Sequence, residues 1–416
     1  MPKPSPARAI GRAVALGAIT GVFSLVYLFL VEEGTHALWG DEGSTEWFSG
    51  GVWSIVIPIG AGLLIGLTYV LLKLPARFDG FISELQDGHV EPSTAPGALL
   101  VAVISLIGGA SLGPEAPLGT AGGAAGTWLA RRAGADEERV RVATFTGISG
   151  AFGGLLSTPL GGPLLAFELE HEQTHSYYFN HLVPGVIAGA VSFGILYPTL
   201  GAPFLGLYDV PTADFRSWML LAGVGIGLFG AVAAILIGRT IKAITTLMSP
   251  LDSRPILRGL VGGAAIAAIA FTSPLTLFSG VDGLVPIIDN PTQFGVLALV
   301  ILAILKTMAM SVSIGGGFYG GTIFPMFFIG GTLGVVVHII FPAIPIGLAL
   351  GATMSAVGGT LAMIPLAMTI ITSLLVKADF LMSGAILMAA ITGFTVRYLL
   401  ENRDSAGPDA PETMQR

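Results

Sequence analysis

Long apolar stretches alternate with short polar ones along this chain. The stretches Ala13 to Val31, Gly51 to Leu72 and Trp218 to Gly238 contain no Asp, Glu, Lys or Arg. Each supplies about 20 apolar residues, which is enough for a helix that crosses the hydrocarbon core of a bilayer. A longer stretch, 307–376, also lacks these charged residues and must therefore hold several helices. The pattern predicts an all-α polytopic membrane protein.

The composition agrees with this prediction. Of 416 residues, 53% are hydrophobic and only 11% are charged, whereas about 25% are charged in an average soluble protein. The balance is acidic, with 26 Asp and Glu against 19 Lys and Arg, which argues against a nucleic acid partner because phosphates attract the opposite charge. The absence of Cys excludes disulfides and thiolate metal sites.

The polar segments indicate the orientation in the membrane. Residues 1–12 carry three basic residues, so the positive-inside rule places this N-terminus in the cytoplasm. The loop 31–51 has no Lys or Arg and is expected outside. Residues 401–416 are polar and contain Pro, which predicts a disordered cytoplasmic tail. We expect a multi-pass protein of the cell inner membrane.

Gly and Pro interrupt many of the apolar stretches. Broken backbone at membrane depth is tolerated only inside protein or around a watery cavity. Two breaks, at Glu115 and Ile323, lie at similar distances from the first spans of the two halves of the chain. Paired breaks predict an inverted repeat with its binding site between the repeats. We therefore expect a transmembrane domain over 13–400, with halves of roughly 13–210 and 211–400.

The stretch GPEAP at the first break has the chemistry of an anion site. Pro followed by Glu in the first turn is a helix start, and the unpaired amides and the dipole of such a terminus attract anions. The second break, GGTIFP, offers further amides. Two such termini could hold a dehydrated anion, and the Glu115 carboxylate could fill the site until it is protonated or displaced. The alternative is a Glu that only complements its own helix dipole.

Three segments resemble the CLC family of chloride channels and proton–chloride antiporters. SLGPEAPLG resembles the family's G-[RK]-E-G-P stretch, and GISGAFGGLLSTPLGGPLLAFELE resembles its small-residue helix with P-L-x-G and F-x-x-E. The segment from Lys306 to Pro325 resembles a Lys-led helix that runs into G-G-x-F-x-P. The likeness covers roughly residues 75 to 400. It implies a homodimer in membrane lipid, in which each subunit is an inverted repeat of broken and re-entrant helices with its own pore for chloride or a similar small anion, without a cofactor.

The resemblance also implies the members of the anion site. Glu115 is the expected gate, and the expected anion-binding residues are Gly113, Glu115, Ala116, Thr322, Ile323, Phe324 and Tyr398. Because Phe324 stands one place later than in the family, the matching amides belong to Thr322 and Ile323. Tyr398 has a second interpretation, as a membrane-interface anchor beside Arg397.

Some residues depart from the family pattern. Pro114 stands where the family usually has Arg or Lys, and Asp79 stands where it has a Ser that contacts the anion. The family's antiporters carry a proton-transferring Glu where this chain has Leu169, which cannot relay a proton. Its neighbours Glu168 and Glu170 are candidates for a substitute proton path. We therefore expect channel-like or weakly proton-coupled transport.

Lys306 lies in an apolar stretch and allows two interpretations. Its long side chain could extend to a membrane interface and keep its charge in water. Alternatively, its charge could contribute positively near the anion path.

The stretch HEQTHSYYFNH suggests a competing function. His171, Glu172 and His175 have the H-E-x-x-H spacing of a zinc protease, and His181 follows where one protease group has a third ligand. However, Tyr178 stands where that group needs a Gly turn, and on a continuous helix His181 would lie about 15 Å from the first His. We keep an intramembrane zinc metalloprotease as an alternative, beside a secondary transporter of another small anion. The first expectation is a transporter, not an enzyme, without a bound metal.

Overall fold

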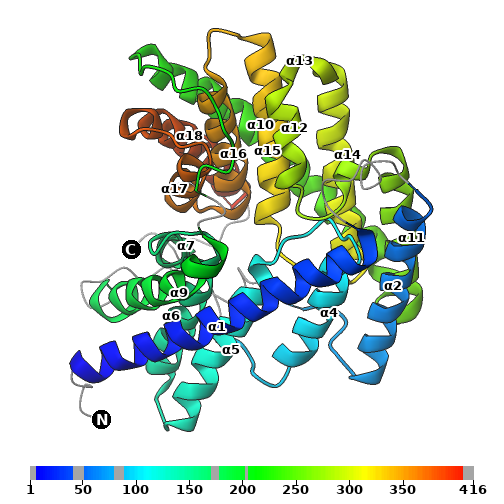
Figure 1. Ribbon diagram of the computed structural model, residues 1–416, viewed down its shortest axis with the longest axis vertical. Helices are drawn as coiled ribbons and strands as arrows, with labels where there is room; N and C mark the ends of the chain where they lie inside the picture. Colours follow the sequence, from blue (N-terminus) through cyan, green and yellow to red (C-terminus); the bar gives the residue numbers. More distant parts are fainter. Residues whose placement is uncertain (1–5, 41–50, 79–88, 170–177, 202–204, 406–416) are drawn as a thin grey trace.

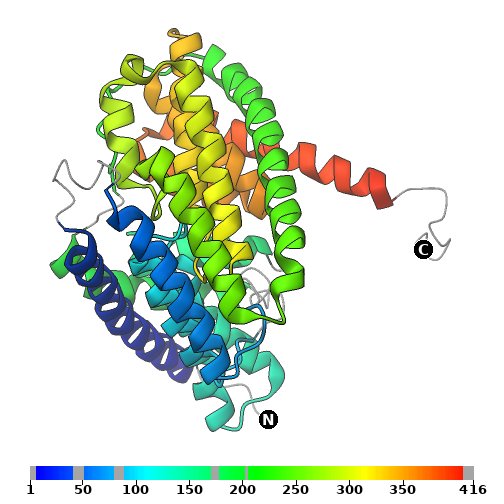
Figure 2. The ribbon, with the colours of Figure 1, turned by 90° about the vertical axis from the view of Figure 1, so that its right-hand side faces the viewer.

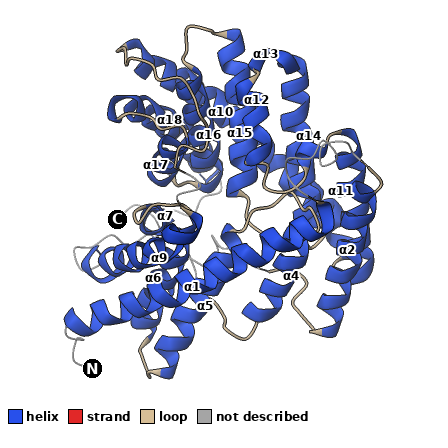
Figure 3. Cartoon of the chain, in the orientation of Figure 1, coloured by secondary structure: helices blue, strands red, loops and turns tan. Residues whose placement is uncertain are grey.

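The computed structural model describes residues 6–40, 51–78, 89–169, 178–201 and 205–405. In these ranges the chain forms helices and one isolated β-bridge, and no strand (Figure 3). The first half contains α1 (Pro6–Trp39), α2 (Trp53–Leu71), α4 (Ala95–Ile107), α5 (Glu115–Arg132), α6 (Glu137–Leu155), α7 (Gly161–Leu169), the π-helical turn η1 (Tyr178–Leu182) and α9 (Val183–Leu200). The second half contains α10 (Trp218–Met248), η2 (Ser249–Leu251), α11 (Pro255–Thr272), η3 (Pro274–Thr276), η4 (Asp282–Leu284), α12 (Val285–Asp289), α13 (Pro291–Phe294), α14 (Val296–Gly315), α15 (Ile323–Ile340), α16 (Ile346–Ala362), α17 (Pro365–Leu375) and α18 (Phe380–Ser405).

The helices confirm the predicted fold class. Eight of the described helices are long and apolar enough to cross a membrane. Helix α10 begins at Trp218, as the apolar pattern predicted, and α2 falls within the predicted stretch 51–72. The charge-free stretch 307–376 holds the end of α14 together with α15, α16 and α17.

The ends of the chain are more helical than expected. Helix α1 already begins at Pro6, inside the predicted cytoplasmic N-terminus, and α18 continues to Ser405, five residues into the tail that was expected to be disordered. The extension of α18 is supported by an ion pair between Arg397 and Glu401, with an N···O distance of 2.8 Å at i,i+4 spacing. The prediction of disorder from residue 401 onward is therefore wrong for the first turn of the tail.

The two halves of the chain contact each other through closely packed helices. Figure 2 shows α2 beside α11. A Cβ at Gly62 would lie 2.1 Å from the carbonyl oxygen of Gly259, and a Cβ at Gly259 would lie 2.0 Å from that of Gly62. Only glycine permits this backbone approach, which is the packing that membrane helices favour.

Helix α15 is the centre of the fold. In the most apolar 18-residue stretch of α15, 83% of the residues are buried. The corresponding share is 33–56% in the other helices that are long and apolar enough to cross a membrane. In Figure 1, α15 lies in the upper part of the molecule and α5 in the lower part, and the loops before them meet between the two. Both helices start at the breaks that the sequence indicated, at Glu115 and Ile323. Pro114 is the residue before α5 and not its first helical residue.

Candidate functional site: paired helix N-termini and a buried carboxylate

The loops that precede α5 and α15 are joined backbone to backbone. The amide of Gly113 donates to the carbonyl oxygen of Gly321 at 2.9 Å, and the amide of Gly321 donates to that of Gly113 at 2.8 Å. A Cβ at Gly113 would lie 2.1 Å from Oε2 of Glu115, and a Cβ at Gly321 would lie 2.0 Å from its Cδ. Both positions therefore need glycine, because the Glu115 side chain occupies the space beside the bridge.

The Glu115 carboxylate fills the N-terminus of α15. Its side chain is fully buried, and Oε1 accepts hydrogen bonds from the amides of Ile323 at 2.7 Å and Phe324 at 3.4 Å. Helix α15 has no side-chain cap of its own at Thr322. A carboxylate from the other half of the chain thus takes the place that an anion prefers at a helix start. Its second oxygen, Oε2, has no hydrogen-bond partner among the described residues.

The remaining predicted backbone ligands are placed differently. The amide of Gly113 donates to the β-bridge, so it is not directed at the carboxylate. Thr322 precedes the helix, and the described contacts of the carboxylate do not include its amide. Ala116 is buried in the first turn of α5, next to Glu115. The amides at the carboxylate are therefore those of Ile323 and Phe324, one position later than the expected pair, because α15 begins at Ile323.

Tyr398 lies on α18. Helix α18 packs against α10, α16 and α17, and Tyr398 is 51% exposed on it, with its ring stacked on Phe394 at 6.3 Å. The neighbouring Arg397 donates to the carbonyl oxygen of Thr360 at 2.9 Å. The described contacts of Tyr398 do not include Glu115, and both interpretations of Tyr398 stay open. Asp79 lies outside the described residues.

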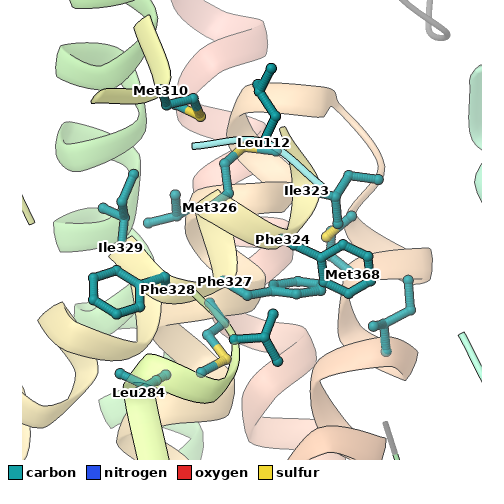
Figure 4. Packing of buried hydrophobic residues seen from close by; sticks show 14 of the residues in the cluster. Leu112, Leu284, Met310, Ile323, Phe324, Met326, Phe327, Phe328, Ile329 and Met368 are labelled. Carbon is teal, nitrogen blue, oxygen red and sulfur yellow. The ribbon is translucent and has the colours of Figure 1, made fainter. Parts of the chain in front are cut away.

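Apolar side chains surround the start of α15. Figure 4 shows Leu112 and Met326 beside Ile323 and Phe324, all of them buried. The rings of Phe324 and Phe327 contact edge to face at a centroid distance of 5.9 Å. In such an apolar environment, the partial charges of backbone amides act on an anion more strongly than they would in water.

Glu168 makes a second contact of the same kind. Its Oε1 accepts from the amide of Leu366 and its Oε2 from that of Ala367, both at 2.7 Å. Glu168 on α7 therefore caps the first turn of α17, which has no side-chain cap at Ile364. This role of Glu168 was not predicted from the sequence, although a helix start at Pro365 without a local cap is a signal for a distant acceptor. Glu170 lies outside the described residues.

Lys306 does not extend to a membrane interface. Its side chain is fully buried, and Nζ donates to the carbonyl oxygens of Thr276, Leu277 and Phe278 at 3.1, 2.9 and 2.7 Å. The structure therefore contradicts the interpretation in which the Lys306 side chain extends to a membrane interface and keeps its amino group in water.

The zinc pattern cannot be assembled from the described residues. His171, Glu172 and His175 lie outside them. His181 is buried on η1, with its ring edge-on to Phe145 at 5.8 Å. Among the residues that the structure describes, no group of three His, Cys, Asp or Glu could hold a metal ion.

Known sequences resemble this chain over most of its length. The chain is 27% identical over 342 residues to the Escherichia coli protein YfeO, which is provisionally named an ion-transport protein, and the match covers 80% of this chain and 79% of the relative. The Escherichia fergusonii protein of the same name is also 27% identical, with the same coverage.

Solved structures share the fold. A slow cyanobacterial Cl⁻/H⁺ antiporter superimposes with a TM-score of 0.81 at 17% identity, covering 96% of both chains. A CLC-type fluoride/proton antiporter superimposes with a TM-score of 0.76 at 16% identity, covering 95% of this chain and 97% of the other. The family model described as voltage gated chloride channel matches residues 61–397. With most of the chain matched, this protein belongs to the voltage gated chloride channel family, the CLC family.

Proposed function

We propose that this multi-pass membrane protein conducts a small inorganic anion, chloride first among the candidates, through a pore that Glu115 gates. The observation that supports the proposal is the contact of the Glu115 carboxylate with the Ile323 and Phe324 amides. A carboxylate is an anion, so the amides that hold it can hold a permeating anion in its place. Neutralising or displacing the carboxylate then opens the site.

The site suits an anion that must enter and leave. Partial charges of amides attract an anion without the full charge of a salt bridge, which keeps binding favourable enough to enter and weak enough to leave. Oε2 of Glu115 has no hydrogen-bond partner among the described residues. Fewer hydrogen bonds must therefore break when the carboxylate leaves the amides.

Transport is proposed to be channel-like or weakly coupled to protons. Leu169 occupies the position of the proton-transferring Glu in the antiporters. Glu168 is bonded through both oxygens to the start of α17, which makes it a better helix cap than a mobile proton carrier. This leaves Glu170 as the candidate for any residual coupling.

The assembly is proposed to follow the family. We expect two copies of the chain to form a homodimer in the inner membrane, with a separate pore in each copy.

The protease alternative receives no support from the comparisons, because the family and the related proteins of known fold are transporters and channels.

Anion flux from reconstituted vesicles tests the proposal. Purified protein is placed in lipid vesicles loaded with potassium chloride, fluoride or nitrate, and release is measured with an anion-selective electrode after the membrane potential is clamped. We expect release of at least one anion, faster at acidic pH and with little or no coupled movement of protons. Release of none of the three anions above the rate of protein-free vesicles at any pH would contradict the proposed function.

A further inference from the structure

Lys306 makes three hydrogen bonds in the protein interior. An ammonium group has three N–H donors, whereas a neutral amine has two. Three carbonyl oxygens lie within 3.1 Å of Nζ. All three contacts are favourable only for the ammonium, since a neutral amine would leave one oxygen facing a lone pair. The geometry of the three contacts therefore fits an ammonium donor.

One of these carbonyls leads to the loop that carries Glu115. Phe278 accepts from Lys306 through its carbonyl oxygen, and its own amide donates to the carbonyl oxygen of Gly109 at 3.4 Å. Trp39 contacts the Phe278 ring edge to face at 5.1 Å and donates to the carbonyl oxygen of Ile107 at 2.8 Å. These contacts hold the chain just before the Gly113 bridge.

The same ammonium also contacts α15. Nζ lies 5.1 Å from the centre of the Phe328 ring, a cation–π geometry. Phe328 is four residues, about 6 Å along the helix axis, beyond Phe324, whose amide faces the carboxylate. Lys306 thus contacts the second turn of α15 directly, and it is linked to the loop before α5 through Phe278.

The backbone around the ammonium leaves no spare room. Gly280 has φ +83°, and a Cβ there would lie 2.8 Å from Nζ. Phe278 itself has φ +55°, a left-handed conformation that non-glycine residues rarely adopt. The three-carbonyl contact stabilises this unusual turn, so the position of the turn depends on the ammonium.

We propose that Lys306 is a positioning residue of the anion pathway. It holds the Glu115 loop in register with α15 and supplies a fixed positive charge to the anion that replaces the carboxylate. The inference rests on the proposed function, because it concerns the affinity of the same site. Removing a charge close to the site changes the affinity for an anion on the order of tenfold at the effective dielectric constant of a protein interior.

Calorimetric titration of the purified protein tests this role. The Glu115→Gln background removes the competing carboxylate, and potassium chloride and potassium fluoride are the probes. We expect Lys306→Met to weaken anion binding on the order of tenfold in the folded fraction, whereas Lys242→Met, which removes an exposed lysine of α10, leaves it unchanged. A merely structural lysine would lower thermal stability without changing the affinity of the protein that remains folded.

A second variant covers the case in which Lys306→Met does not fold. Gly280→Ala keeps the lysine but forces its Nζ away from the carbonyls, and we again expect weaker anion binding. Affinity equal to the background in a folded Lys306→Met or Gly280→Ala protein overturns the role of Lys306 and leaves the proposed function standing. If the Glu115→Gln background binds neither salt and conducts neither anion in vesicles, both proposals fail together.

Discussion

Oε1 of Glu115 lies 2.7 Å from the amide nitrogen of Ile323, a residue 208 positions further along the chain. One half of the protein thereby closes the helix start of the other half. The bond is made by a group that can lose its charge, so the contact can be broken by a proton or by a competing anion.

Acid should increase anion flux through the native protein. Protonation of Glu115 removes the negative charge that competes with the permeating anion for the amides of Ile323 and Phe324. Glu115→Gln keeps the shape without the charge and should conduct at neutral pH with little further response to acid, and Glu115→Ala should behave in the same way. Flux is measured against pH in vesicles for the three proteins.

A structural Glu115 would give a different result. Loss of a favourable helix-dipole contact costs only about 0.3–1 kcal/mol of stability and leaves the pH profile of transport as it was. Variants that retain the native pH profile would falsify the assignment of Glu115 as the gate.

Gly321→Ala should close the pathway at every pH. The added methyl group would lie 2.0 Å from Cδ of Glu115, in the place where a permeating anion must also pass. We expect low flux that neither acid nor a second substitution, Glu115→Gln, restores. Gly384→Ala is the matched control, because a Cβ at this position meets nothing within 4 Å. Native flux in both Gly321→Ala and Gly384→Ala would show that the space beside the Gly113–Gly321 bridge is not on the anion path.

Glu168→Ala should destabilise the protein more than it changes transport. The substitution leaves the first amides of α17 at Leu366 and Ala367 without their acceptors, and loss of a helix cap typically costs about 0.5–2 kcal/mol. Unfolding by sodium dodecyl sulfate at constant lipid ratio, followed by circular dichroism, measures the change. Unaltered stability together with a lost proton response would instead make Glu168 a proton carrier.

Chloride flux should proceed with little or no proton counterflux. The aliphatic side chain of Leu169 cannot carry a proton, so an imposed chloride gradient should not drive steady proton movement. Vesicle pH is followed with an entrapped dye during chloride flux, with and without a protonophore. Sustained proton pumping that Glu170→Gln abolishes would show that the neighbouring carboxylate has taken over this task.

His171→Ala and His175→Ala should leave folding and anion flux close to those of the native protein. The proposed transport uses no metal at these side chains. Metal content by mass spectrometry and flux in vesicles test the expectation on the same samples. Stoichiometric zinc, lost in both variants along with a peptide-cleaving activity, would restore the protease hypothesis.

The sequence alone determined which segments enter the membrane and where the critical helices begin. Charge-free stretches predicted the spans, since burying a charge in lipid is unfavourable. The Gly and Pro breaks predicted the starts of α5 and α15, and the lone Glu in an apolar stretch identified Glu115. These are local properties, and short stretches of sequence contain them completely.

Only the tertiary structure decided which groups meet. Glu115 with Ile323, Glu168 with Leu366, and Lys306 with Phe278 are contacts between segments far apart in the chain. Helix starts have unpaired amides wherever they occur, so their sequence indicates an acceptor but not which one. A match counted along the chain likewise left two interpretations of Tyr398 open, and its neighbours are known only from the packing of α18 against α10, α16 and α17. The partner of a buried charge depends on how the helices pack in three dimensions, and local sequence patterns do not contain that information.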